Sequence, residues 1–246
     1  MRLAGKTAIV TGGGSGIGRA IAAAFVCEGA QVVICGRGAR KLEQAATEIG
    51  PQCLAVAADV SHTEDINRLV DQTVRKFKRL DIVVNNAGIL LAGTAESLTE
   101  EQWEQTYKTN VRAVWQLSRA ALPHLRAAGR GSIINIASVL SSLGARNRVA
   151  YAASKGAVLA MSRAMALDHA EENIRINCIC PGIVETEMVA AFNLDEKARQ
   201  QRIAAHPMGR FGQPADISGL AVFLASDEAS WITGAAFPAD GGYSAH

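Results

Sequence analysis

Residues 7–18 of the chain, TAIVTGGGSGIG, join a short apolar run to a glycine-rich turn. The apolar residues are typical of a buried strand, and residues 16–28 are predicted to form a helix. Glycines at such a junction permit a tight turn and let the backbone approach a pyrophosphate, which the positive end of the helix dipole attracts. A plain turn is the alternative, because a glycine-rich loop alone is a weak signal. The position favours a dinucleotide-binding turn made by Gly12, Ser15, Gly16, Ile17 and Gly18.

Strands and helices alternate along the rest of the chain. Near-continuous apolar runs predict strands at residues 6–12, 31–36, 53–59, 80–88, 131–138, 174–182 and 235–240. Further helices are predicted at residues 40–49, 64–77, 100–109, 111–125, 151–170 and 215–224. Such runs are typical of parallel strands covered on both faces, and the alternation favours right-handed βαβ units. We predict an α/β protein: one doubly wound Rossmann domain over residues 1–246, with a parallel seven-stranded sheet and helices on both faces.

Composition and charge favour some classes of function over others. Hydrophobic residues make up 49% of the 246 residues and the net charge is +2, without a basic tract. This balance favours small-molecule chemistry and predicts neither a nucleic-acid nor a membrane partner. The amino terminus lacks the pattern of a signal peptide, and no apolar stretch approaches the roughly 18–20 residues of a membrane helix, so we expect a cytoplasmic protein. Five cysteines, an odd number, are expected to be reduced thiols, and no cluster around them predicts a metal site.

The ends of the predicted strands carry candidate cofactor residues. Arg37 follows Gly36 where an NAD-binding protein normally has an acidic residue, so NADP(H) is favoured and NAD(H) is the alternative. A solvated surface arginine is the simpler interpretation of Arg37. The next two strands end in Asp59-Val60 and in Asn86-Ala87-Gly88, positions that face a dinucleotide in this kind of fold. A turn cap explains Asp59, and a turn residue explains Asn86, equally well.

A second group of residues suggests proton-transfer chemistry. Tyr151 and Lys155 are four residues apart near the start of a predicted helix and therefore share one face. A lysine cation would lower the tyrosine pKa from about 10 toward the range useful for acid–base catalysis. Ser138, at a strand end, could bond a substrate oxygen, and Asn110, between two predicted helices, could hold a water. Each of these two residues has a cap as its simpler interpretation.

Together these pieces resemble the short-chain dehydrogenase/reductase family. The matching segments are TGGGSGIG (11–18), DV (59–60), NNAG (85–88), Asn110, Ser138, YAASK (151–155), PGIVETEM (181–188) and the C-terminal segment 207–242. The resemblance implies an oxidoreductase that moves a hydride between a nicotinamide and an alcohol/ketone pair. It implies Tyr151 as general acid/base, Lys155 on the nicotinamide ribose, Ser138 on the substrate oxygen and Asn110 on a water. It also places Pro181, Gly182, Val184 and Thr186 beside the nicotinamide.

Fewer residues of the sequence bear on the identity of the substrate. The branch that looks closest contains the 3-oxoacyl-(acyl-carrier-protein) reductases. Gly129 and Glu172 stand where carrier-docking members have basic residues, so we expect a smaller secondary alcohol or ketone, with the carrier-linked substrate as second choice. Residues 184–213, the least regular stretch, are predicted to form the substrate loop, and Arg146 and Arg148 suggest a polar or anionic substrate. A non-catalytic dinucleotide sensor is the alternative of another class.

Assembly is also predicted from the resemblance. The helix from Tyr151 carries small residues, and family members usually pair through this helix and the preceding long one. We therefore expect a homotetramer with two-fold axes, its interface including the apolar residues Val111, Val114 and Leu117. Packing of the small residues within the subunit is the alternative.

Overall fold

Seven parallel strands form one sheet in the computed structural model, which describes residues 1–193 and 195–245. The strand order is β3-β2-β1-β4-β5-β6-β7, so the direction of winding reverses between β1 and β4. The strands are β1 (Thr7–Thr11), β2 (Gln31–Gly36), β3 (Cys53–Ala57), β4 (Ile82–Asn85), β5 (Gly131–Ile136), β6 (Ile174–Pro181) and β7 (Ala236–Ala239). Ligands of such sheets bind at this reversal, outside the carboxyl ends of the strands.

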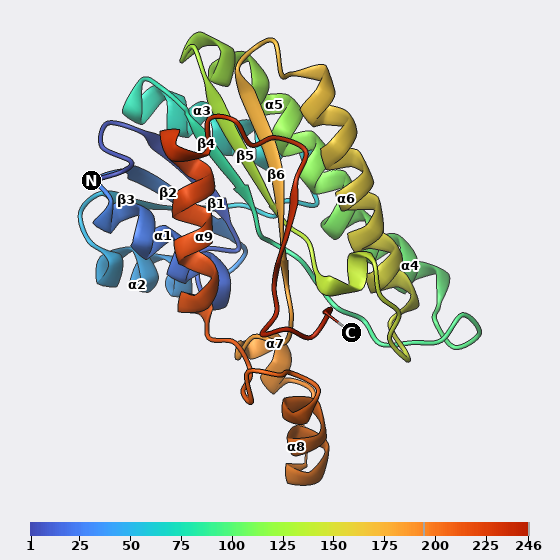
Figure 1. Cartoon of the computed structure of the whole chain (residues 1–246). Helices are drawn as coiled ribbons and strands as arrows, with labels where there is room; N and C mark the ends of the chain where they lie inside the picture. The colour runs from blue at the N-terminus through green and yellow to red at the C-terminus, as the bar shows by residue number, and fades with distance from the viewer. Residues whose placement is uncertain (194, 246) are drawn as a thin grey trace.

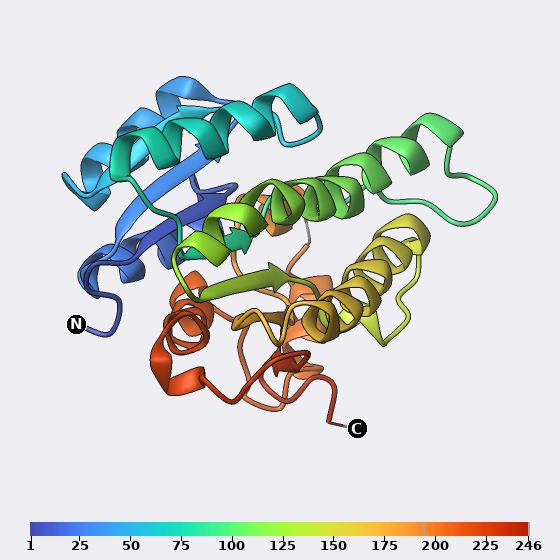
Figure 2. The ribbon, with the colours of Figure 1, turned by 90° about the horizontal axis from the view of Figure 1, so that it is seen from above.

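Helices cover both faces of the sheet, as the sequence predicted. The longer ones are α1 (Gly16–Cys27), α2 (Ala39–Ile49), α3 (Thr63–Phe77), α5 (Ala113–Ala127), α6 (Val149–Asp168) and α9 (Pro214–Ala225). Buried residues of α1, α2 and α9 pack on one face, and those of α3, α5 and α6 on the other. Seen from above, β5 lies between α5 on one side and α9 on the other (Figure 2). The doubly wound Rossmann fold is therefore confirmed.

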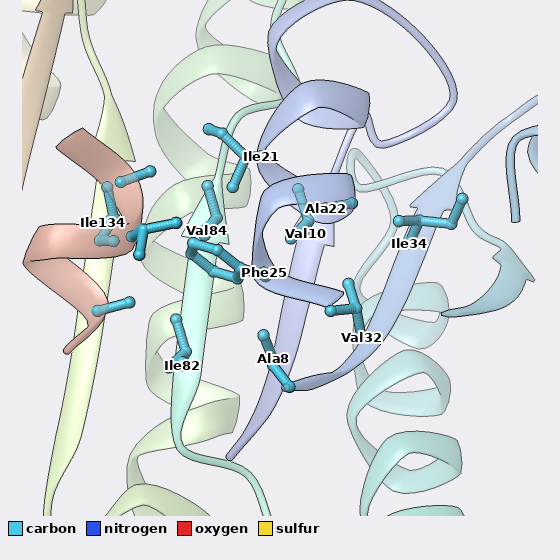
Figure 3. Packing of buried hydrophobic residues seen from close by; sticks show 14 of the residues in the cluster. Ala8, Val10, Ile21, Ala22, Phe25, Val32, Ile34, Ile82, Val84 and Ile134 are labelled. Atoms are coloured by element: carbon cyan, nitrogen blue, oxygen red, sulfur yellow. The ribbon is translucent and has the colours of Figure 1, made fainter. Parts of the chain in front are cut away.

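The strand sequences explain why both faces are covered. Successive side chains of a strand point to opposite faces, so a strand that is apolar throughout needs a partner on each side. In β1, Val10 packs with the α1 layer and Ile9 with the α3 layer. Figure 3 shows Ile21 and Phe25 of α1 lying over the strands beside Val84.

Between β4 and β5 the sequence predicts two separate helices, at residues 100–109 and 111–125, but the structure has one continuous helix there. Helix α4 (Glu100–Tyr107) continues into α5 through a π-helical segment, Lys108–Arg112. Insertions of this kind are rare and occur often at functional sites. The side chain of Asn110 lies inside this segment with 1% of its surface exposed. Asn110 therefore does not interrupt a helix, as the sequence suggested, but sits in a widened turn of one continuous helix.

The predicted substrate loop, residues 184–213, is more regular than expected. It contains the short helices α7 (Glu187–Ala190) and α8 (Glu196–Ala204), while Leu194 lies outside the described residues. Figure 1 shows α7 and α8 extending away from the body of the sheet below β6. The role of this segment and the extent of the single domain, which includes the undescribed His246, stay predictions.

The subunit interface residues predicted on α5 need correction. Val114 is 5% exposed and Leu117 is 1% exposed, because both side chains pack inside the subunit. The neighbouring Trp115 points outward instead, with 44% of its surface exposed. None of the helices within residues 1–193 and 195–245 is long and apolar enough to cross a membrane.

Candidate active site

A cavity of about 930 Å³ lies at the carboxyl ends of the strands and brings the predicted residues together. Its wall includes Gly12, Ser15, Gly16, Ile17, Arg37, Asp59, Val60, Asn86, Ala87, Gly88, Ser138, Tyr151, Lys155, Pro181, Gly182, Val184 and Thr186. Two predicted residues, Gly18 and Asn110, do not line the cavity. They lie behind its wall, where Gly18 faces Gly12 and Asn110 faces Gly88.

The glycine-rich turn has the geometry that a pyrophosphate needs. Gly12 and Gly16 have φ angles of 64° and 52°, in the left-handed region that favours glycine. At Gly18 an added Cβ would lie 2.4 Å from the main-chain oxygen of Gly12, so this position tolerates no side chain. Ser15 precedes α1, but its side chain accepts no hydrogen bond from the helix. The first N–H groups of α1 therefore do not have the Ser15 hydroxyl as a partner. These features fit a bound phosphate at the start of α1.

Asn86 connects this turn to β4. Its side-chain amide donates to the main-chain oxygens of Thr11 and Gly12, at 2.8 and 3.3 Å. The Thr11 hydroxyl accepts in return from the main-chain N–H groups of Asn86 and Ala87, both at 2.9 Å. The NNAG segment therefore holds the carboxyl ends of β1 and β4 together at the point where the sheet reverses.

The adenosine end of the cavity carries Arg37 and Asp59. Arg37 is exposed beside Gly36 and Gly38, and it forms no ion pair with any residue that the structure describes. Asp59 accepts a 2.9 Å hydrogen bond from the main-chain N–H of Ser61. Burial opposes ionisation of Asp59, but the hydrogen bonds from Ser61 together with the nearby His62 and Arg37 side chains outweigh it, so the pKa lies below its usual value. Asp59 thus caps a turn and also faces the cavity.

Tyr151 and Lys155 lie on the same face of α6, with the lysine nitrogen 5.7 Å from the centre of the tyrosine ring. Burial raises the pKa of Tyr151 to about 12, against the smaller opposing effects of the Ser138 hydroxyl and the Arg148 charge. Burial also lowers the pKa of Lys155 to about 8. The lowered tyrosine pKa expected from the sequence is therefore not found in the protein alone, because desolvation of the phenol outweighs the nearby charges.

The amine of Lys155 has capacity for a further ligand. It is 5% exposed and donates a 2.7 Å hydrogen bond to the main-chain oxygen of Ile136. An ammonium group has three donors, and among the described residues this oxygen is the one acceptor that it contacts. A Cβ at Gly88 would lie 3.6 Å from the lysine nitrogen, so the glycine leaves space beside it. The arrangement fits a group with several hydroxyls, such as a ribose.

Ser138 and Asn110 flank this pair. The Ser138 hydroxyl accepts from the Leu140 N–H at 3.1 Å, so its own hydrogen is free to point into the cavity. The Asn110 amide oxygen accepts from the Ile89 N–H, and its nitrogen donates to the Ile89 oxygen, both at 2.9 Å. The same nitrogen donates to the hydroxyl of Ser154 on α6 at 3.1 Å. Asn110 therefore fixes the segment after β4 to the helix that carries Tyr151.

Several wall residues were missed by the sequence analysis. His206 is 2% exposed; its Nδ1 lies 2.7 Å from the Arg202 oxygen and its Nε2 lies 3.4 Å from the Ile183 nitrogen. Because a carbonyl oxygen only accepts, Nδ1 donates and Nε2 accepts, which describes a neutral ring. Glu187 of α7 pairs with Lys41 of α2, and the Ser15 hydroxyl lies 3.5 Å from it. Glu187 lies within the PGIVETEM segment (181–188), but no motif marks His206 or Lys41, because their contacts form only through the fold.

Comparisons with known proteins agree with this geometry. The family model described as enoyl-(acyl carrier protein) reductase matches residues 12–244. L-Fucose dehydrogenase from Bos taurus is 43% identical over 246 residues, which cover 98% of this chain and 90% of that protein. A protein described as an NAD(P)-dependent gluconate 5-dehydrogenase from Beutenbergia cavernae, solved with NADP, has a TM-score of 0.94 and 41% identity, covering 99% and 98% of the two chains. The 3-ketoacyl-(acyl-carrier-protein) reductase from Brucella melitensis, solved with NADH, has a TM-score of 0.94 and 38% identity, covering 98% and 99%.

Proposed function

The chain belongs to the short-chain dehydrogenase/reductase family of NAD(P)-dependent oxidoreductases, and on that premise we propose which of its residues carry the reaction. The reaction exchanges a hydride between the nicotinamide and a secondary alcohol or ketone. One observation carries the proposal: the glycine-rich turn and the Tyr151–Lys155 pair, far apart in sequence, line one cavity.

The wall residues fit a dinucleotide from end to end. Gly12, Gly16 and the start of α1 would hold the pyrophosphate, with Gly18 supporting the turn from behind. Asp59 and Val60 would lie at the adenine, and Asn86, Ala87 and Gly88 along the ribose of the adenosine. Pro181, Gly182, Val184 and Thr186 would line the nicotinamide, which when bound supplies or accepts the hydride.

The protein's own residues would transfer the proton and hold the substrate and the coenzyme in place. Tyr151 would donate its phenolic proton to the carbonyl oxygen in reduction and accept it back in alcohol oxidation. Its pKa of about 12 keeps it protonated, and so ready to act as an acid, at neutral pH. The Ser138 hydroxyl would donate to the same substrate oxygen. Lys155 has two N–H groups available and would bond the nicotinamide ribose with them. Asn110, in the widened helical turn, would hold a water that links the Lys155 amine to solvent.

We also propose a preference for NADP(H). The support is Arg37, which is exposed at the adenosine end and has no carboxylate partner among the described residues. A guanidinium bonds a phosphate with two parallel hydrogen bonds, while NAD(H) offers it no such anion. The solved relatives named above hold NADP in one case and NADH in the other, so the two coenzymes are both compatible with this architecture.

The substrate is proposed to be a small or medium secondary alcohol or ketone. A carrier-linked 3-oxoacyl group is the second candidate, in keeping with the relative from Brucella melitensis, a 3-ketoacyl-(acyl-carrier-protein) reductase. The position that would face an acidic carrier holds Glu172, whose carboxylate pairs with Arg126 at 2.8 Å and with His169 at 3.0 Å. Because Glu172 offsets the charge of its basic neighbour, this position has no excess positive charge that would attract an acidic carrier.

The proposal also covers the oligomeric state and the cellular location. We propose a homotetramer, in which the outward-facing Trp115 of α5 would belong to the interface. We propose a cytoplasmic location, supported by the five cysteines, none of which forms a disulfide within residues 1–193 and 195–245.

The direct test is oxidation of NADPH by the purified protein in the presence of aliphatic ketones, diketones and a 3-oxoacyl thioester. Turnover with simple ketones supports the proposed function, and turnover restricted to the thioester supports the second candidate. Binding of NADPH without turnover of any carbonyl compound would indicate a sensor rather than an enzyme.

A further inference from the structure

The substrate half of the cavity has an unbalanced charge. Two carboxylates, Asp59 and Glu187, line the cavity among the described residues. Asp59 is bonded to Ser61, and Glu187 is paired with Lys41, so neither is available to a cation elsewhere in the cavity. The cavity wall also includes the cationic side chains of Lys108, Arg148 and Arg202.

Arg148 and Arg202 approach the same space from different parts of the chain. Arg148 immediately precedes α6, one helical turn before Tyr151, and its guanidinium lies 4.8 Å from the ring centre of Phe192. Arg202 projects from α8, whose end is held by the hydrogen bond between His206 and the Arg202 oxygen. Both side chains line the cavity, and burial together with the charge of Arg202 holds the pKa of Arg148 below its usual value.

Eight of the 18 arginines form an ion pair with a carboxylate among the described residues. Arg126, Arg130, Arg199 and Arg210, for example, each have a carboxylate partner within 3.0 Å. Arg199 is one helical turn before Arg202 on α8 and pairs with Glu185, whereas Arg202 faces the cavity. Neither Arg148 nor Arg202 has an acidic partner in the part of the chain that the structure describes. Two half-buried like charges without a counterion are unfavourable, and an anion between them would remove that cost.

We propose that the substrate carries a carboxylate and that Arg148 and Arg202 bind it, which makes the protein an oxidoreductase of hydroxy and oxo acids. Planar guanidinium groups match the geometry of a carboxylate and can bond it with two parallel hydrogen bonds. Arg148 is one turn from Tyr151, so the carboxylate lies within a few carbons of the carbon that reacts. Because Arg202 and Phe192 belong to the predicted substrate loop, the same anion would join that segment to the body of the protein. This inference rests on the proposed function and narrows it to one substrate class.

The test compares matched acids and esters. Rates of NADPH-dependent reduction are measured for 3-oxobutanoate and 4-oxopentanoate and for the methyl ester of each, which keeps the ketone and removes the charge. We expect kcat/KM for at least one acid to exceed that of its ester by roughly tenfold or more, the ratio that a single charged hydrogen bond supplies. Arg148→Gln and Arg202→Gln should each lower the acid-to-ester ratio, mainly through the KM of the acid.

Arg146→Gln is the matched control, because Arg146 is two residues from Arg148, exposed and outside the cavity wall. It should leave the ratio unchanged. Equal rates for acids and esters, or a ratio unaffected by either cavity variant, would overturn the carboxylate site while leaving the oxidoreductase function intact. If no ketone is reduced, calorimetric titration of 3-oxobutanoate into the protein with NADP⁺ decides the matter: binding that is lost in Arg202→Gln supports the site, and absence of binding refutes it.

Discussion

Lys155 donates a hydrogen bond of 2.7 Å from its side-chain nitrogen to the main-chain oxygen of Ile136, the last residue of β5. This bond anchors the helix that carries Tyr151 to the carboxyl end of the central sheet. It also fixes the lysine beside Gly88, where the absence of a side chain leaves its remaining donors accessible. The Lys155 amine therefore has a fixed position between α6, the end of β5 and Gly88.

The first prediction is a pH dependence set by Lys155. Its pKa of about 8 means that the cation is present below that pH and is lost above it, while Tyr151, with a pKa of about 12, stays protonated. We expect kcat/KM for carbonyl reduction to fall as the pH rises above about 8, since this parameter reports the free enzyme. A profile between about pH 7 and 10 measures it. Lys155→Arg, whose charge does not titrate, should remove the fall from any remaining activity, and a level wild-type profile would contradict the assignment.

Tyr151→Phe is expected to lower kcat by about 10²–10⁴-fold, because the ring still packs but no longer exchanges a proton. Coenzyme affinity, measured by NADPH fluorescence, should change little. Tyr107→Phe is the control: Tyr107 stacks on Trp103 at 4.8 Å, outside the cavity wall, and should turn over normally. A Tyr151→Phe enzyme within a few-fold of wild type would exclude Tyr151 as the general acid.

Arg37→Asp is expected to reverse the coenzyme preference. Removing one charged hydrogen bond to a phosphate costs about 1.5–3 kcal/mol, and the new carboxylate would also repel the phosphate and accept from a ribose hydroxyl. The wild-type ratio of kcat/KM for NADPH over NADH should lie between roughly 10 and 100 and fall below one in the variant. Arg40→Asp makes the same charge change at an exposed position outside the cavity wall and should keep the ratio. Wild type preferring NADH would refute the role of Arg37.

Gly18→Ala should destabilise the protein and weaken coenzyme binding together. The added Cβ would lie 2.4 Å from the Gly12 oxygen and from the Asn86 amide nitrogen, so the phosphate turn must move. Overpacking of this kind costs about 1–3 kcal/mol. Gly219→Ala, in α9, meets no atom within 4 Å and should stabilise the fold by about 0.5–1 kcal/mol. Thermal unfolding of both variants checks the pair, and a Gly18→Ala protein as stable as wild type would be inconsistent with the observed packing.

Light scattering tests the proposed assembly. A tetramer predicts a molar mass of about four times the 25.9 kDa of the chain. Trp115→Glu, which places a charge on the outward face of α5, should lower that mass. Arg75→Glu introduces an acid at an exposed position on α3 and should not. A monomeric wild type at micromolar concentration would rule the tetramer out.

Local patterns in the sequence determined much of this protein. Apolar strands that need cover on both faces, separated by helices, are sufficient to indicate a doubly wound parallel sheet. The glycines at positions 12, 16 and 18 predict a phosphate-binding turn because only that residue type fits the backbone there. The spacing of Tyr151 and Lys155 predicts their shared face because a helix repeats every 3.6 residues.

The tertiary structure decided what depends on contacts between distant segments. The widened turn at Asn110 follows from its bonds to Ile89 and Ser154, which no local pattern encodes. Burial sets the pKa values of Tyr151 and Lys155, and burial is a property of the packed molecule rather than of a motif. Arg148 and Arg202 likewise line one cavity only in the folded chain, because residues separated by 53 intervening positions share a space only when the fold brings them there.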